Sequence, residues 1–164
     1  MTLFAPTLLA MTAKVLSGAQ ARKLTICTAE SCTGGLLAGC LTEIAGSSAV
    51  IDRAFITYSN RAKEEMLGVP PDIMVASGAV SEPTARAMAE GALRKSGASL
   101  SIAITGIAGP GGGSAEKPVG LVHFAIARAG ETRHKVEHFG EIGRTEVRLK
   151  SVETALNMLL EMLD

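Results

Sequence analysis

Apolar residues recur along the chain with two different periods, which predicts helices alternating with strands. Between Pro6 and Arg22 the apolar positions have helical spacing. The segment from Ser81 to Gly97 has a serine suited to an N-cap and a glycine suited to the residue after the last turn. The pattern therefore predicts four longer helices, over 6–22, 34–44, 81–97 and 144–163.

Short apolar runs between turn residues predict five strands. The run Ser99–Thr105 is almost wholly apolar, as expected of a strand covered on both faces. Helices and strands in this order predict one domain over residues 1–164, with an α/β fold: a three-layer α/β/α sandwich around a mainly parallel, mixed sheet. The strands are predicted within 24–28, 49–59, 99–105, 121–130 and 132–140.

Three shorter segments connect these elements. Asn60 is predicted to cap a short helix that runs to Leu67 and ends at Gly68. The segment 68–80, rich in proline and glycine, is predicted to be a connection. The segment 106–120 is predicted to be a long glycine-rich loop.

Composition argues against nucleic acid as a partner. The chain has 16 Lys and Arg against 16 Asp and Glu, so its formal net charge is zero. A protein that binds the phosphate backbone of a nucleic acid needs a basic surface. With no Trp and one Tyr, the chain also lacks the aromatic side chains on which single-strand binders stack bases.

The cysteines and the apolar runs predict a soluble cytoplasmic protein that does not bind a membrane. Cys27, Cys32 and Cys40 are odd in number and form no C-x-x-C pair, which disfavours a disulfide framework or a zinc site. No long uninterrupted apolar run is present. A net-neutral chain of positive mean hydropathy is compatible with a homo-oligomer.

Three segments follow predicted strands and carry polar or flexible residues. They are "AESCTGG", "TYSNRAK" and "TGIAGPGGG". In open α/β sheets ligands bind beyond the carboxyl ends of the strands, so we expect these segments to form the site. Ser31 at a strand-to-helix turn is a candidate nucleophile, because helix-start N–H groups would stabilise negative charge there. The alternatives are that Ser31 or Thr33 only caps the helix, or that Cys32 is the nucleophile.

Lys63 is the candidate base. If Asn60 caps its helix, Lys63 lies in the first turn, where the helix dipole lowers the pKa of the amine. Ser–Lys pairs are an established alternative to Ser–His–Asp. Tyr58 would relay a proton or orient the serine. The competing interpretations are a solvated helix lysine and a tyrosine that packs on its strand.

The glycine-rich loop after Thr105 matches neither the dinucleotide-binding nor the P-loop pattern. Its glycines would let backbone N–H groups approach a phosphate or carboxylate. The alternative is that the loop is only a flexible connector. The three histidines, His123, His134 and His138, lie in predicted strands and are interpreted as surface or core residues rather than ligands.

Four blocks in order resemble one known family. "AESCTGG", "FITYSNRAKEEMLGV", "SGAVSEPTARAMAEGA" and "ITGIAGPGGGSAEKPVG" resemble the CinA C-terminal domain, the nicotinamide-nucleotide amidase family, from about residue 6 to the end. The resemblance implies hydrolysis of nicotinamide mononucleotide to nicotinate mononucleotide and ammonia. It implies no metal and no organic cofactor, and it indicates the free-standing form of the domain.

The resemblance also assigns roles to residues. The family's nucleophile falls on Ser31, its tyrosine on Tyr58 and its lysine on Lys63. The family pattern F-x-G-D-R-x-x-V-R is partly kept as "FGEIGRTEVR", which has one extra residue and places Gly143 where an acid is expected. The substrate-binding residues predicted from these blocks are Glu30, Cys32, Thr33, Gly34, Gly35, Thr105, Gly106 and Arg144.

Two other functions remain compatible with the same residues. A non-catalytic nucleotide-sensing or partner-binding module linked to competence or damage responses would use the same glycine-rich turns without an activated serine. A small amidase or esterase for another acyl group would use the same Ser–Lys pair on a different substrate.

Overall fold

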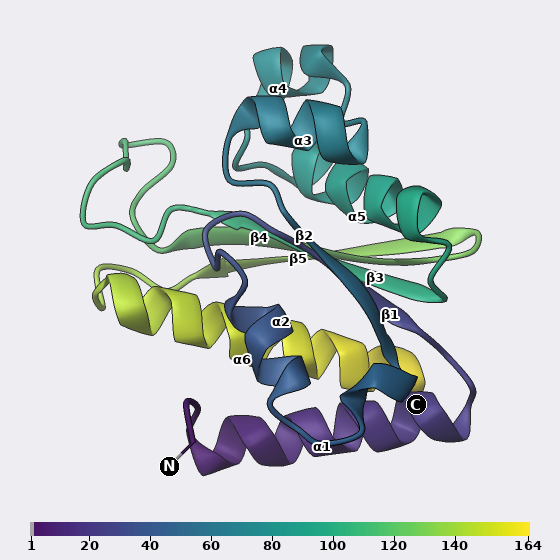
Figure 1. Ribbon diagram of the computed structural model, residues 1–164. Coiled ribbons are helices and arrows are strands. Elements are labelled where there is room, and N and C mark those ends of the chain that lie inside the picture. Colours follow the sequence, from purple (N-terminus) through teal and green to yellow (C-terminus); the bar gives the residue numbers. More distant parts are fainter. Residues whose placement is uncertain (1) are drawn as a thin grey trace.

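A five-stranded mixed sheet lies at the centre of the computed structural model, which describes residues 2–164 (Figure 1). The strand order is β2-β1-β3-β4-β5. β1 pairs in parallel with β2 and β3, while β3, β4 and β5 pair antiparallel, so the predicted mixed α/β sandwich is confirmed. The strands are β1 (Ile26–Glu30), β2 (Ile51–Ile56), β3 (Leu100–Gly106), β4 (Leu121–Arg128) and β5 (Glu131–His138).

Helices cover both faces of the sheet. α2 (Leu36–Thr42) and α6 (Arg144–Leu163) lie on one face, and α1 (Pro6–Ala21) covers them from outside (Figure 1). The opposite face carries α3, α4 and α5 (Figure 1). Their bounds are Asn60–Leu67, Pro71–Ser77 and Glu82–Ser96, and a short 3₁₀ helix, η1, spans Ser47–Ala49.

The start of α2 differs from the prediction. The sequence pattern placed the helix start at Gly34, but α2 begins at Leu36. Gly34 and Gly35 have φ values of 55° and 99°, in the left-handed region that glycine adopts and a right-handed helix does not. A five-residue turn therefore separates the end of β1 from α2. β1 itself runs from Ile26 to Glu30, two residues later than predicted.

Two further predictions between β2 and α5 were wrong. Ser59, not Asn60, caps α3, and its hydroxyl accepts a hydrogen bond of 3.0 Å from the Ala62 N–H. The segment predicted as a connection contains α4, because Pro71 occupies the first helical position, where a missing N–H is tolerated. The predicted bounds of α6 and the Ser81 and Gly97 caps of α5 are confirmed.

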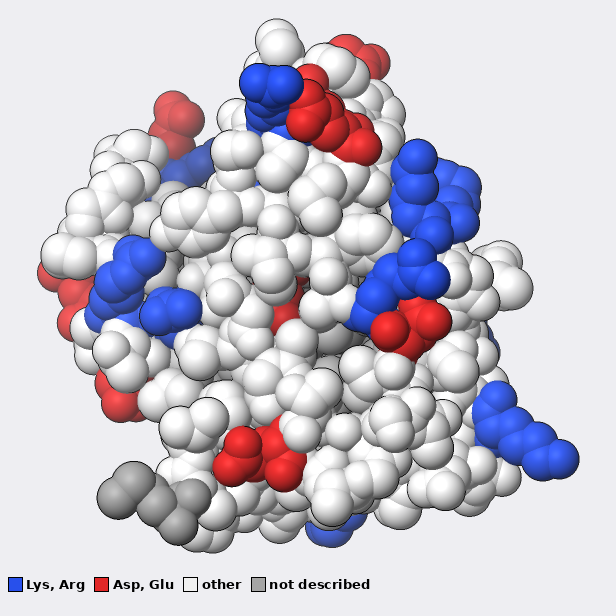
Figure 2. Space-filling model, in the orientation of Figure 1, with Lys and Arg blue, Asp and Glu red and all other residues white. Residues whose placement is uncertain are grey.

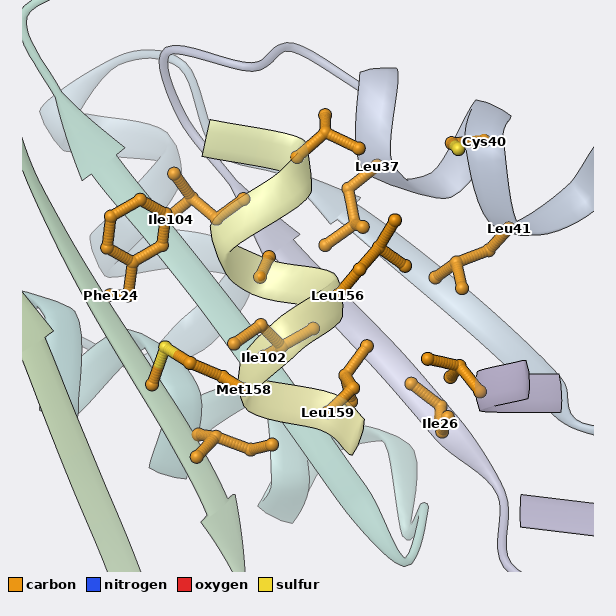
Figure 3. Packing of buried hydrophobic residues seen from close by; sticks show 14 of the residues in the cluster. Ile26, Leu37, Cys40, Leu41, Ile102, Ile104, Phe124, Leu156, Met158 and Leu159 are labelled. Atoms are coloured by element: carbon orange, nitrogen blue, oxygen red, sulfur yellow. The ribbon is translucent and has the colours of Figure 1, made fainter. Parts of the chain in front are cut away.

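The two faces of the sheet are packed differently. Towards α2 and α6 the core contains large side chains, including Leu37, Phe124 and Leu156 (Figure 3). Towards α5 it contains mainly alanines, and the Ser101 hydroxyl donates a 2.6 Å hydrogen bond to the Ala89 carbonyl. The small side chains allow α5 to lie close to the sheet.

Several surface charges are paired. Exposed ion pairs join Arg61 with Glu65 and Lys150 with Glu153. In the view of Figure 2, red and blue groups stand side by side at several places around a mostly uncharged centre. Within residues 2–164, no helix has the length and apolar character needed to span a bilayer.

α3 is held against α5 by a close approach at Gly91. A Cβ atom at this position would lie 2.1 Å from the backbone oxygen of Leu67, the last residue of α3. Only glycine therefore allows the two helices to pack at this separation. Because α3 carries Lys63, this contact also determines where that side chain lies.

Gly91→Ala should destabilise the protein by about 2 kcal/mol, because the added methyl forces α3 away from α5. Gly18→Ala is the matched control: its Cβ would lie 3.5 Å from Leu163 Cδ1, an ordinary contact, so it should stabilise α1 by about 0.5–1 kcal/mol. Urea unfolding of both variants measures the difference. Equal stability changes in the two variants would contradict the close approach.

Candidate active site

A cavity of about 280 Å³ opens where β1 and β3 end. This is the carboxyl edge of the parallel strands, as expected for an open α/β sheet. All three predicted segments contribute to it. Ser31 and Cys32 come from the turn after β1, Tyr58, Asn60 and Lys63 from β2–α3, Thr105 to Gly112 (without Pro110) from the end of β3 and the glycine-rich loop, and Arg144 from α6.

Lys63 and Ser31 are in direct contact at the base of this cavity. Lys63 Nζ lies 2.9 Å from Ser31 Oγ, 2.8 Å from the Thr57 carbonyl oxygen and 3.5 Å from the Tyr58 carbonyl oxygen. The lysine is 1% exposed and the serine 8%. No ion pair among residues 2–164 involves Lys63. The amine is thus buried without a carboxylate to stabilise its charged form.

Burial lowers the pKa of Lys63 from 10.5 to about 8, because removal from water disfavours the ammonium. The helix dipole, which the sequence argument invoked, is not the main cause. A neutral amine donates two hydrogen atoms and accepts one. The two carbonyl oxygens take the donated hydrogens, so the lone pair is left for the hydroxyl of Ser31. In its neutral form, Lys63 in this arrangement can accept the proton of the Ser31 hydroxyl.

Cys32 is a weaker candidate nucleophile than Ser31. It lines the cavity but is buried, and burial raises the pKa of its thiol to about 11. Because the thiolate is the reactive form, the thiol is inert near neutral pH.

Tyr58 lies at the rim of the cavity rather than beside Ser31. Its side chain is 61% exposed, and its hydroxyl accepts a 3.0 Å hydrogen bond from Arg144 Nη2. Arg144 Nη1 donates to the Gly109 carbonyl at 2.8 Å. The contact between Tyr58 and Lys63 involves only the tyrosine's backbone carbonyl. Tyr58 and Arg144 together connect β2, the glycine-rich loop and α6 across the cavity mouth.

Thr105 and Gly106 form the wall at the end of β3. The Thr105 hydroxyl donates to the Ala79 carbonyl at 2.8 Å. A Cβ atom at Gly106 would lie 2.6 Å from Val122 Cγ2 and 2.9 Å from the Leu121 oxygen, so the pairing with β4 requires glycine here. Both residues therefore shape the cavity through the backbone they support.

Glu30 has a different place from the one predicted for a substrate-binding residue. Its carboxylate is fully buried and accepts hydrogen bonds from the N–H groups of Gly35, Leu37 and Ala38 at 2.9–3.1 Å. It therefore caps α2. The N-terminal donors of α2 are occupied by a protein carboxylate, so they cannot serve a substrate. Neither Glu30 nor Thr33, Gly34 and Gly35 lines the cavity.

The turn after β1 nevertheless contains free donors. Ser31 N–H donates to the Ile104 carbonyl and Gly34 N–H to the Ser31 carbonyl. In the part of the chain that the structure describes, the N–H groups of Cys32 and Thr33 donate to no protein acceptor, although both residues are buried. Buried N–H groups without partners are rare, and here they follow the candidate nucleophile directly.

Sequence reasoning missed two contributors to the site. Asn60 was assigned to helix capping, but Ser59 has that role and Asn60 lines the cavity. Arg148 donates from Nε to the Cys32 carbonyl at 3.1 Å and from Nη2 to the Thr33 carbonyl at 3.0 Å. The spacing of Arg144 and Arg148, four residues apart, was a signal in the sequence that both lie on one helix face.

Within residues 2–164, no three His, Cys, Asp or Glu side chains gather in a way that could hold a metal ion.

Glu30→Gln should destabilise the protein by about 2 kcal/mol, because the amide group cannot accept from all three N–H groups and turns a donor toward one of them. Glu65→Gln, which removes an exposed charge from the Arg61 pair, should change stability by less than about 0.5 kcal/mol. Urea unfolding at neutral pH tests both. Equal effects would show that the buried carboxylate does not hold α2.

The chain is similar to proteins of known sequence over most of its length. The CinA C-terminal domain family matches residues 8–163 of the chain. A CinA-like protein from Syntrophus aciditrophicus is 51% identical over 138 residues, which is 84% of this chain and 33% of that protein. A CinA-like protein from Anaeromyxobacter dehalogenans is 49% identical over 146 residues, 88% of this chain and 35% of that protein. The chain spans about a third of the length of these curated relatives.

Solved structures have the same fold. The crystal structure of a competence/damage inducible protein, CihA, from Agrobacterium tumefaciens superimposes with a TM-score of 0.98 at 54% identity, covering 100% of both chains. That of a competence damage-inducible protein A from Klebsiella pneumoniae gives a TM-score of 0.91 at 38% identity, covering 95% of this chain and 96% of that one. With a family match over nearly all of its length, the chain belongs to the CinA C-terminal domain family.

Proposed function

We propose that this protein hydrolyses nicotinamide mononucleotide to nicotinate mononucleotide and ammonia, using Ser31 as nucleophile and Lys63 as base. One observation carries the proposal: the buried Lys63 amine, with a pKa near 8, lies 2.9 Å from the Ser31 hydroxyl. A buried lysine with no ion-pair partner is unfavourable for folding, and such groups are concentrated at functional sites. The resemblance to nicotinamide-nucleotide amidases supports the choice of substrate.

The first step is attack on the carboxamide. Neutral Lys63 takes the proton of the Ser31 hydroxyl while Oγ bonds to the carboxamide carbon, whose carbonyl oxygen becomes an anion. The free N–H group of Cys32, which lines the cavity, is the donor that we assign to this oxyanion, and the Thr33 N–H lies next to it in the same turn. The pyridinium ring of the substrate withdraws electrons and makes the carboxamide carbon more electrophilic.

The second step releases ammonia. The tetrahedral intermediate collapses, the C–N bond breaks, and the Lys63 ammonium protonates the departing nitrogen. An ester on Ser31 remains, and Lys63 is neutral again. Water then attacks this ester while Lys63 takes its proton; the bond to Ser31 Oγ breaks, the serine recovers the proton, and nicotinate mononucleotide leaves.

The rim of the cavity suits the phosphate end of the substrate. Arg144 is exposed and points its guanidinium across the mouth toward Tyr58 and Gly109. Gly111 and Gly112 follow in the lining, where N–H groups can approach an anion without interference from side chains. We assign phosphate binding to this group.

Ser31→Ala and Lys63→Ala should each lower the rate of ammonia release from nicotinamide mononucleotide by at least about 10³-fold, because each removes one member of the reacting pair. Both variants should keep nucleotide affinity within a few-fold. Arg61→Ala, on the same helix but in a surface ion pair, should retain wild-type rates. A chelator should have no effect on any of the four proteins.

Three outcomes would change this assignment. Full activity in Ser31→Ala would show that Ser31 is not the nucleophile and would make Cys32 the next candidate. Binding of the nucleotide by wild type without release of ammonia would favour a nucleotide-sensing module. Release of ammonia or alcohol from other amides or esters, but not from this nucleotide, would indicate a different acyl substrate.

The pH dependence of kcat/KM should show one ascending limb with an apparent pKa of about 8. The base must be unprotonated to act, so the rate should fall about tenfold per pH unit below that value and level off above it. Steady-state kinetics between pH 6 and 9.5 measure the limb. A limb near pH 6.5, the range of an ordinary histidine, would identify a different base.

A further inference from the structure

Arg148 reaches from the second turn of α6 to the turn that carries Ser31. Its Nε and Nη2 donate to the carbonyls of two consecutive residues, Cys32 and Thr33, at 3.1 and 3.0 Å. The side chain is partly buried, and no ion pair within residues 2–164 involves it. Its charge is therefore directed at two peptide groups instead of a carboxylate.

This contact sets the direction of the neighbouring N–H groups. In a trans peptide the C=O and the following N–H point in opposite directions. Because Arg148 holds the Cys32 carbonyl, the Thr33 N–H points away from α6. The next N–H, of Gly34, is similarly directed away from Arg148 and donates to the Ser31 carbonyl at 3.0 Å. Among residues 2–164, the Thr33 N–H has no protein acceptor, although Thr33 is fully buried.

The guanidinium also strengthens these donors. A charged donor on a carbonyl oxygen polarises the whole peptide group, and its N–H becomes a better donor in turn. Gly34 lies beside this contact: a Cβ atom there would be at an ordinary 3.5 Å from Arg148 Nη2, while the φ of 55° favours glycine. On its other side the same turn is held by the Glu30 carboxylate through the Gly35 N–H.

We propose that Arg148 is a positioning residue for the reaction of Ser31: its guanidinium fixes and polarises the Cys32–Thr33 and Thr33–Gly34 peptides, and so prepares the turn to receive the oxyanion. The proposal rests on the proposed Ser31 chemistry. It differs from a merely structural tie between α6 and the turn, because it predicts that the rate of the chemical step depends on the charge and the two-pronged shape of this side chain.

The experiment compares Arg148→Ala, Arg148→Lys and the control Lys150→Ala, which removes an exposed lysine of α6 paired with Glu153. With nicotinamide mononucleotide as substrate, Arg148→Ala should lower kcat at least 30-fold (about 2 kcal/mol) while KM stays within threefold. Arg148→Lys should recover part of kcat. Added guanidinium ion at tens of millimolar should raise kcat of Arg148→Ala at least fivefold and leave wild type unchanged.

A second measurement tests the reactivity of Ser31 without the proposed substrate. Phenylmethanesulfonyl fluoride reacts with an activated serine: the Oγ–S bond forms, fluoride leaves, and the base takes the hydroxyl proton. The rate of labelling at Ser31, followed by mass spectrometry, should fall at least tenfold in Arg148→Ala and remain unchanged in Lys150→Ala. The melting temperature of each variant is measured at the assay pH, so that a loss of stability can be recognised.

The outcomes separate the two proposals. If wild type is labelled at Ser31 but releases no ammonia, the proposed substrate is wrong, and the labelling rates still decide the role of Arg148. Wild-type kcat and labelling in Arg148→Ala would overturn the positioning role. A raised KM with unchanged kcat would make Arg148 a substrate contact instead. A rate loss that guanidinium does not restore and that Arg148→Lys shares in full, together with a lowered melting temperature, would leave only the structural tie.

Discussion

The buried amine of Lys63 is the feature on which the rest of the site depends. Lys63 is 1% exposed, and its amine contacts Ser31 Oγ and the carbonyl oxygens of two residues before α3. Because the pKa of Lys63 is lowered in the folded state from 10.5 to about 8, its burial reduces stability below about pH 8. This penalty, on the order of 3 kcal/mol, fades as the pH rises from 8 to 10.5. The fold tolerates it and thereby places an amine of lowered pKa beside Ser31.

The turn that carries Ser31 is held by opposite charges on its two sides. Glu30 binds the N–H groups at the start of α2, and Arg148 binds the carbonyls of Cys32 and Thr33. Gly34 and Gly35, whose φ values lie in the left-handed region, let the chain pass between Glu30 and Arg148. Rigid support of this kind is what a preorganised oxyanion site requires, because donors that are already oriented need no rearrangement during the reaction. The turn over residues 31–35 therefore holds Ser31 in place and also supplies N–H donors.

Local sequence patterns predicted much of the fold and the central pair of residues. The α6 pattern and the Ser81 and Gly97 caps of α5 depend on local spacing and local hydrogen bonds, so they could be recognised without a structure. The contact between Ser31 and Lys63 could be anticipated, because parallel strands bring the segments after them to one edge. The cause of the lysine's lowered pKa could not, because burial depends on segments distant in sequence, such as the turn that carries Ser31.

The residues that were misplaced depend on choices that local sequence does not decide. Ser59 and Asn60 are both good N-cap residues, and only the geometry of the chain after β2 selects the serine. Glu30 looked like part of a ligand site because it precedes Ser31, yet the side-chain alternation of β1 turns it inward to α2. The spacing of Arg148 from Arg144 indicates a shared helix face, but the carbonyl that Arg148 contacts lies 116 residues away in sequence, so that partner could not be predicted.

The most direct test of this account is the pKa of Lys63 itself. The protein can be labelled with ¹³C at lysine Cε and titrated by NMR between pH 6 and 12, with Lys63→Arg identifying the resonance. The account predicts that the Lys63 signal titrates near pH 8, well below the other lysines, and that Ser31→Ala leaves this value within one unit, since burial is its cause. A Lys63 signal that titrates near 10.5 would contradict the account, because almost none of the amine would then be neutral at neutral pH, whereas a pKa near 8 leaves about a tenth of it neutral and able to activate Ser31.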